Sequence, residues 1–169
     1  MTAMAVERPA VRPRLRPALL AVALLLPLAP ASGAEAAPVA VTALPPSRAE
    51  AATWTVALQL PSPLRAGAPA SATIRLTARA GHHVNLEYPA AFKPDGRATA
   101  TFSGPRVALA LTARRPCAGS PAEACEVTLA LPFTPGMERT RLSGMVLFSV
   151  CTAERCLIER IALGAEAAR

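Results

Sequence analysis

Two cysteines near the C-terminal end of the sequence, Cys151 and Cys156, have the clearest potential for chemistry. A cysteine pair can form a structural disulfide or take part in thiol–disulfide exchange, in which a thiolate attacks a disulfide sulfur. Arg155 precedes Cys156, and a nearby cation favours thiolate over thiol, although Glu154 acts in the opposite direction. The Cys-x4-Cys spacing differs from the Cys-x-x-Cys motif of thioredoxin-like proteins, and spacing alone favours a turn clamp.

The segments around this pair predict two strands joined by a four-residue turn. Val146, Phe148 and Val150 alternate along the first strand, so they mark the face that points into a core. Cys151 is out of phase with them, and Cys156 falls on the less apolar face of the return strand. We therefore expect a Cys151–Cys156 disulfide that is accessible rather than buried.

The other two cysteines, Cys117 and Cys125, bracket a loop that contains Gly, Ser and Pro between two strand-like segments. Four cysteines allow three pairings, and the sequence does not fix the choice. Closure of short loops favours the sequential pairing, Cys117–Cys125 with Cys151–Cys156. In the loop-entropy account a bridge this short contributes about 2 to 3 kcal/mol, so Cys117–Cys125 is interpreted as a structural disulfide.

Residues 1–34 have the features of a secretory signal peptide. Four arginines precede an apolar run, 18–28, and small residues suited to cleavage follow it. The run is shorter than the roughly 20 residues of a membrane span, so no stable span is expected once the signal is removed. We expect a periplasmic or secreted protein, whose cysteines pair in an oxidising compartment.

Composition excludes several classes of partner and site. Removal of residues 1–34 takes away four arginines and one glutamate, so the formal net charge falls from +7 to +4. The remaining arginines are scattered and aromatic residues make up 4%, which argues against nucleic-acid binding. His82 and His83 would point to opposite faces of a strand, and His83, Asn85 and Glu87 on one face form only a weak set of ligands, so no metal site is expected. Asp95 is the sole aspartate, which weakens hydrolase and calcium-site hypotheses. No phosphate-cradling glycine loop occurs, and no cofactor is expected.

The rest of the chain predicts one all-β domain, an immunoglobulin-like antiparallel β-sandwich over 53–164. It would follow an Ala/Pro-rich flexible linker, 35–52, and precede a short tail, 165–169. Segments with period-two alternation recur at 54–60, 72–79, 84–88, 98–102, 107–111, 127–133 and 146–150. The residues predicted to form the core are Trp54, Val56, Ile74, Leu76, Leu109, Leu129, Leu131, Val146, Phe148 and Val150.

The segment 148–158, FSVCTAERCLI, resembles the last hairpin of the N-terminal periplasmic domain of DsbD-type thiol:disulfide interchange proteins. The segment 81–89, GHHVNLEYP, is similar to the strand that enters the active-site region of that family. The resemblance implies an immunoglobulin-like fold, a redox pair at Cys151 and Cys156 flanked by Tyr88 and Phe148, and a periplasmic thiol or disulfide protein as partner.

Two classes of function stay open. In the first, Cys151 and Cys156 exchange electrons with a partner protein, as the resemblance implies. In the second, the domain is a non-catalytic, disulfide-stapled β-sandwich for interaction or scaffolding in the cell envelope. Leu157-Ile158 stand where the family usually has Tyr-Pro or Pro-Pro, which favours the second class.

Export predicts that the mature protein begins near Ala34 or Ala36, because small residues precede these positions. N-terminal sequencing of protein recovered from the envelope fraction measures this start. Protein that keeps Met1 and sediments with membranes would contradict the prediction.

Overall fold

The computed structural model describes residues 43–167, and this part of the chain is all β. No helix that could cross a membrane is found in it. The predicted all-β, antiparallel fold class is confirmed. The strands are β1 (Arg48–Glu50), β2 (Trp54–Gln59), β3 (Ala70–Ala78), β4 (His83–Val84), β5 (Ala91–Pro94), β6 (Val107–Ala108), β7 (Ala110–Cys117), β8 (Ser120–Phe133), β9 (Thr140–Cys151) and β10 (Cys156–Ala167).

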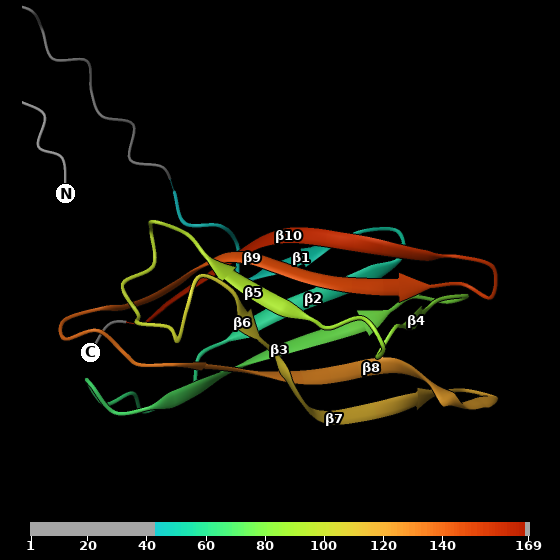
Figure 1. The fold of residues 1–169 in the computed structure, drawn as a ribbon, viewed down its shortest axis with the longest axis horizontal. Coiled ribbons are helices and arrows are strands. Elements are labelled where there is room, and N and C mark those ends of the chain that lie inside the picture. Colours follow the sequence, from blue (N-terminus) through green and yellow to red (C-terminus); the bar gives the residue numbers. More distant parts are fainter. Residues whose placement is uncertain (1–42, 168–169) are drawn as a thin grey trace, which may run out of the picture. The chain divides into compact units, whose positions relative to one another are not determined.

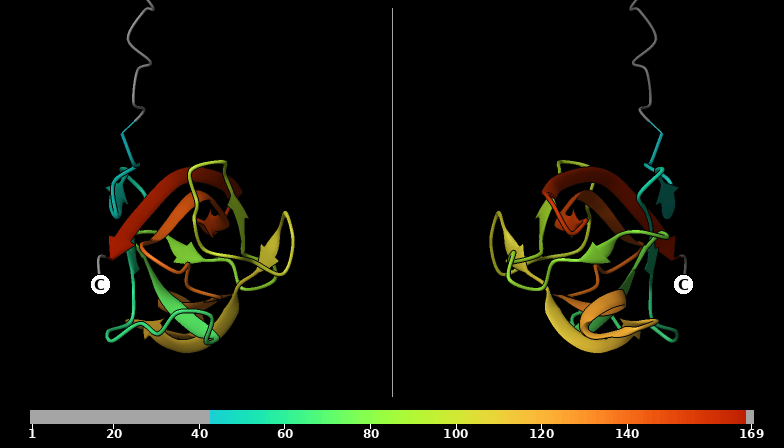
Figure 2. Two further views of the ribbon diagram at one scale, coloured as in Figure 1. Left: turned by 90° about the vertical axis from the view of Figure 1, so that its left-hand side faces the viewer. Right: turned by 90° about the vertical axis from the view of Figure 1, so that its right-hand side faces the viewer.

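The strands form one continuous sheet that folds over on itself into two layers (Figures 1 and 2). One layer has the order β1-β2-β3-β8, with β7 also paired to β8. The other contains β10, β9, β5 and β6. The two-residue strand β4 joins the layers, because it pairs with β8 on one side and β9 on the other. The arrangement is that of an open β-sandwich; immunoglobulin-like connectivity stays a prediction.

The core lies between the layers and follows the alternation in the sequence. Strand β3 buries Ala72, Ile74, Leu76 and Ala78 and turns the intervening polar residues outward. Nine of the ten predicted core residues are buried, and the exception is Leu109, which is partly buried against the core. Trp54 and Phe148 meet edge to face with ring centroids 5.2 Å apart, so they connect the two layers.

Strand β9 is the central strand of its layer and has buried residues on both faces, with Met145 as its one exposed residue. It pairs with β10 along its whole length and with β5 and β4 on the opposite edge. Gly144 is required where β5 crosses, because a Cβ there would collide with the Lys93 carbonyl oxygen and the Phe92 ring. The side that the sequence suggested was less apolar is also buried at Leu147, Ser149 and Cys151, although Met145 on the same side is exposed.

Two predicted strands are wrong in extent. The strand expected over 84–88 ends at Val84, because the Asn85 side chain accepts the Glu87 backbone N–H in an Asx turn. The segment 98–102 forms no ladder and contributes one isolated bridge, Thr101 with Thr134. The N–H groups of residues 99 and 100 both donate to the Arg141 carbonyl oxygen, which leaves no regular register for a strand.

The predicted strand 107–111 is divided between the two layers. Its first part, β6, pairs with β5, and its last part opens β7, which pairs with β8. Leu109 lies at the crossing, where its N–H donates to the Ala90 carbonyl oxygen. This position at the boundary explains why Leu109 is only partly buried.

Residues 43–52, the described part of the predicted linker, are hydrogen-bonded to the domain. Strand β1 pairs with β2, and the Gly164 N–H donates to the Pro46 carbonyl oxygen at 3.0 Å. At the other end β10 continues to Ala167. The β-structure is therefore longer than 53–164 in both directions. Residues 1–42, which include the predicted signal peptide, lie outside the described residues.

Asp95 attaches the loop after β5 to β9. Its carboxylate accepts hydrogen bonds from the Arg97 side chain, the shortest at 2.6 Å, and from the Ser143 hydroxyl at 2.9 Å. The hydrogen bonds from Arg97 hold the pKa of Asp95 below its usual value, and they outweigh partial burial, which acts in the opposite direction. The ionised carboxylate therefore stabilises the folded state.

Replacement of the Phe148 ring tests the core between the layers. Phe148→Ala should lower the free energy of unfolding by about 3 to 5 kcal/mol, because it leaves a cavity against Trp54. Leu111→Ala, at a side chain that is 47% exposed, is the control and should change it by less than about 0.5 kcal/mol. Urea unfolding followed by fluorescence of Trp54, the single tryptophan, measures both. Equal effects would contradict this core.

Asp95 predicts a dependence of stability on pH. Because its pKa is lower in the folded state, the stabilisation is complete above the unfolded-state pKa of about 4 and is lost as pH falls through the folded pKa. Asp95→Asn should lower the melting temperature at pH 7, and the deficit should shrink steadily below about pH 4. Thermal scans from pH 7 to pH 2 measure the difference. A deficit that is constant over this range would exclude ionisation as its cause.

Candidate functional site

The β9–β10 hairpin places the two cysteines as the sequence predicts. Cys151 ends β9, Cys156 begins β10, and the two residues lie opposite each other in the antiparallel register. They form a disulfide, with 3.9 Å between their Cα atoms. The turn between them is closed by Thr152, whose N–H donates to the Arg155 carbonyl oxygen at 2.8 Å and whose hydroxyl oxygen accepts the N–H groups of Glu154 and Arg155.

The two ends of this disulfide differ in exposure. Cys156 is exposed, as expected, whereas Cys151 is only 4% exposed, so the prediction that both cysteines are accessible is wrong for Cys151. The reason is the central position of β9: Cys151 pairs with Cys156 on one side and with His83 of β4 on the other. A thiolate from solution can therefore approach Cys156 far more readily than Cys151.

An open groove of about 470 Å³ lies over the disulfide and gives access to it. One wall is the segment from β4 through Glu87, and another comes from β7 and β8. Charged groups of both signs border it. The residues that line it are His83, Val84, Asn85, Leu86, Glu87, Arg114, Ala122, Glu123, Cys151 and Cys156.

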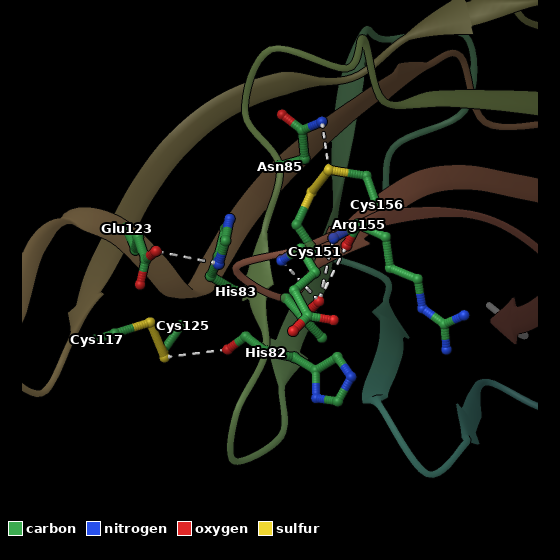
Figure 3. A network of polar contacts seen from close by, with 11 residues as sticks. His82, His83, Asn85, Cys117, Glu123, Cys125, Cys151, Arg155 and Cys156 are labelled. Atoms are coloured by element: carbon green, nitrogen blue, oxygen red, sulfur yellow. Dashed lines mark hydrogen bonds and ion pairs between the residues drawn. A yellow bond between two sulfur atoms is a disulfide. The ribbon is translucent and has the colours of Figure 1, made fainter.

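Asn85 makes the direct polar contact with the exposed sulfur. Its Nδ2 lies 3.8 Å from Cys156 Sγ, within the range of a weak N–H···S hydrogen bond (Figure 3). Its backbone N–H donates to the Ser149 carbonyl oxygen on β9 at 3.0 Å. The residue is therefore fixed to the strand that carries Cys151 while its side chain reaches Cys156.

The two histidines have separate environments. His83 Nδ1 lies 3.4 Å from a Glu123 carboxylate oxygen at the side of the groove, whereas His82 Nδ1 lies 3.2 Å from the Ala80 carbonyl oxygen. Figure 3 shows the two imidazole rings pointing in different directions. Among residues 43–167 no group of three or more His, Cys, Asp or Glu side chains could hold a metal ion.

The second disulfide, Cys117–Cys125, is confirmed with the predicted pairing. It joins β7 to β8 near their two-residue turn, and both cysteines are half-buried. Cys125 Sγ lies 3.7 Å from the His82 carbonyl oxygen, which is a packing contact because a disulfide sulfur carries no hydrogen. The segment His82–His83 therefore passes between the two disulfides (Figure 3).

The three residues expected to flank the pair occupy different places. Arg155 is exposed in the turn, and in Figure 3 its guanidinium extends away from the sulfurs. Tyr88 is half-buried and Phe148 is buried, and both line an apolar cavity of about 130 Å³ between the layers. Val84, Asn85 and Leu86 line both this cavity and the groove, so this segment lies between the aromatic side chains and the disulfide groove.

From the sequence, Asn85 was considered only as one member of a weak set of candidate metal ligands. The contact with Cys156 and the pairing of Glu123 with His83 were missed, because both join segments distant in sequence. The local signal was present: an asparagine two residues before Glu87 and four before Pro89 is typical of an Asx turn that ends a strand.

Comparison with known proteins supplies no family for this arrangement: the chain matches no protein-family model, no curated protein and no solved structure.

Proposed function

We propose that the domain performs thiol–disulfide exchange through Cys151–Cys156 with a partner protein in the periplasm or outside the cell. The observation that carries the proposal is the asymmetry of the disulfide, with one sulfur exposed in an open groove and the other buried. The resemblance of 148–158 to the DsbD N-terminal domain supports the same chemistry. Both disulfides are compatible with the predicted export.

The asymmetry defines the order of the exchange steps. A partner thiolate attacks Cys156 Sγ, the intramolecular S–S bond breaks, and its electron pair leaves on Cys151 Sγ, which takes a proton. A second partner thiolate then attacks the partner's own sulfur in the mixed disulfide, and Cys156 leaves as a thiolate. Two electrons reach the domain and the partner dithiol becomes a disulfide. In the reverse direction the Cys156 thiolate attacks a partner disulfide.

A non-catalytic function is the alternative. Both disulfides close short hairpins whose strands are already paired, which is the position of a staple: Cys117–Cys125 in β7–β8 and Cys151–Cys156 in β9–β10. On this view the chain is an interaction or scaffolding domain of the envelope, and neither disulfide cycles.

The reduction potentials of the two disulfides distinguish these functions. Exchange predicts that the reduction potential of Cys151–Cys156 is less negative than about −300 mV and less negative than that of Cys117–Cys125. Structural disulfides usually have reduction potentials below about −300 mV. The purified protein would be equilibrated in glutathione and dithiothreitol buffers, alkylated, and assigned by mass spectrometry. If both disulfides persist to below about −300 mV, the staple alternative replaces exchange.

A trapping experiment identifies the attacking sulfur and the partner together. Cys151→Ser leaves Cys156 as an exposed thiol that cannot be resolved internally, so it should accumulate a mixed disulfide with the partner in envelope extracts. Cys156→Ser is the matched control and should trap little, because Cys151 is buried. Non-reducing gels and mass spectrometry measure the adducts. Equal trapping by both variants would contradict the assignment of Cys156.

A further inference from the structure

The orientation of the Asn85 side-chain amide is determined by its neighbours. The Glu87 backbone N–H donates to Asn85 Oδ1 at 2.9 Å, and only the oxygen end of an amide can accept this bond. The Nδ2 end must therefore face the disulfide, where it lies 3.8 Å from Cys156 Sγ. Because the backbone of Asn85 is also bonded to Ser149, the donor is fixed relative to the hairpin before any reaction begins.

The charged groups around the groove do not supply an equivalent contact. His83 lies against Glu123, and Arg155 extends away from the sulfurs. Glu87 and Arg114 line the groove with opposite charges, and within residues 43–167 neither makes a hydrogen bond or ion pair with the disulfide. Glu154 is exposed in the turn. Asn85 is thus the directed donor at Cys156 in the described part of the chain.

We propose that Asn85 is a catalytic residue of the exchange, the hydrogen-bond donor that stabilises the Cys156 thiolate. An N–H bond to an anionic sulfur is stronger than the same bond to a disulfide sulfur, so the contact strengthens as negative charge develops. It acts when Cys156 leaves from the mixed disulfide and when the Cys156 thiolate attacks a partner disulfide. The inference rests on the proposed function, with a partner dithiol or disulfide as the co-reactant.

Substitutions that retain the Asx turn isolate the donor. Asn85→Ser keeps a short oxygen acceptor for the Glu87 N–H but cannot reach Cys156, and Asn85→Asp keeps the acceptor while placing an anion where the donor was. In the fully reduced chain, the rate of alkylation at Cys156 would be followed against pH by peptide mass spectrometry. Glu87→Gln is the control, because it retains the backbone N–H and removes a negative charge.

The expected result is a rise of about one pH unit in the midpoint of Cys156 alkylation for Asn85→Ser, and a larger rise for Asn85→Asp. At pH 7 alkylation of Asn85→Ser should be about threefold slower, because a tenfold loss of thiolate is partly offset by the greater nucleophilicity of a more basic thiolate. Glu87→Gln should not raise the midpoint. If circular dichroism shows that Asn85→Ser is unfolded, the proposal is tested with Asn85→Asp, which retains the side-chain length.

Midpoints within about 0.3 unit of the unaltered chain in both Asn85 variants would overturn the proposal. So would an equal rise in Glu87→Gln, since the midpoint would then report disturbance of the loop. Either failure is distinct from failure of the proposed function, because the alkylation assay needs no partner. Exchange itself is decided by the reduction potentials of the unaltered chain.

Discussion

The hydrogen-bonded position of β9 between β10 on one edge and β4 and β5 on the other is the constraint on which the rest of the structure depends. One face of the strand supplies Val146, Phe148 and Val150 to the core, and the opposite face is buried from Leu147 to Cys151. The register of the strand is strongly specified, because a shift of one residue would turn Val146, Phe148 and Val150 away from the core. The disulfide hairpin and β4, which forms one wall of the groove, are both positioned by their pairing with β9.

The chemistry of the hairpin follows from where β9 ends. Cys151 is the last residue of the strand, so it is still covered by its neighbours, while Cys156 begins a strand that is paired on β9 alone within the described residues. One disulfide therefore has a protected and an accessible end. In the proposed exchange, this asymmetry would direct attack to Cys156.

Strand β4 is short, and its brevity is what brings a polar side chain to the disulfide. Its two residues pair with β9 and β8 and then the chain turns at Asn85. Had the strand continued to Tyr88, Asn85 would have no Asx turn to fix its amide. The segment His82–His83 lies between Cys151–Cys156 and Cys117–Cys125, so both disulfides contact the segment that leads into Asn85.

The sequence by itself determined the all-β class, the alternation that defines most of the core and the hairpin at 146–163, and through loop length it favoured the disulfide pairing that the structure has. These features depend on the local periodicity of apolar residues and on the short loops between paired cysteines, and both can be read directly from the sequence. Only the tertiary structure decided that Cys151 is buried, that 107–111 divides between layers, and that Asn85 meets Cys156. Each of these depends on which strands become neighbours although they lie far apart in the sequence. The free energy of that pairing is distributed over many residues, and no local sequence pattern reveals it.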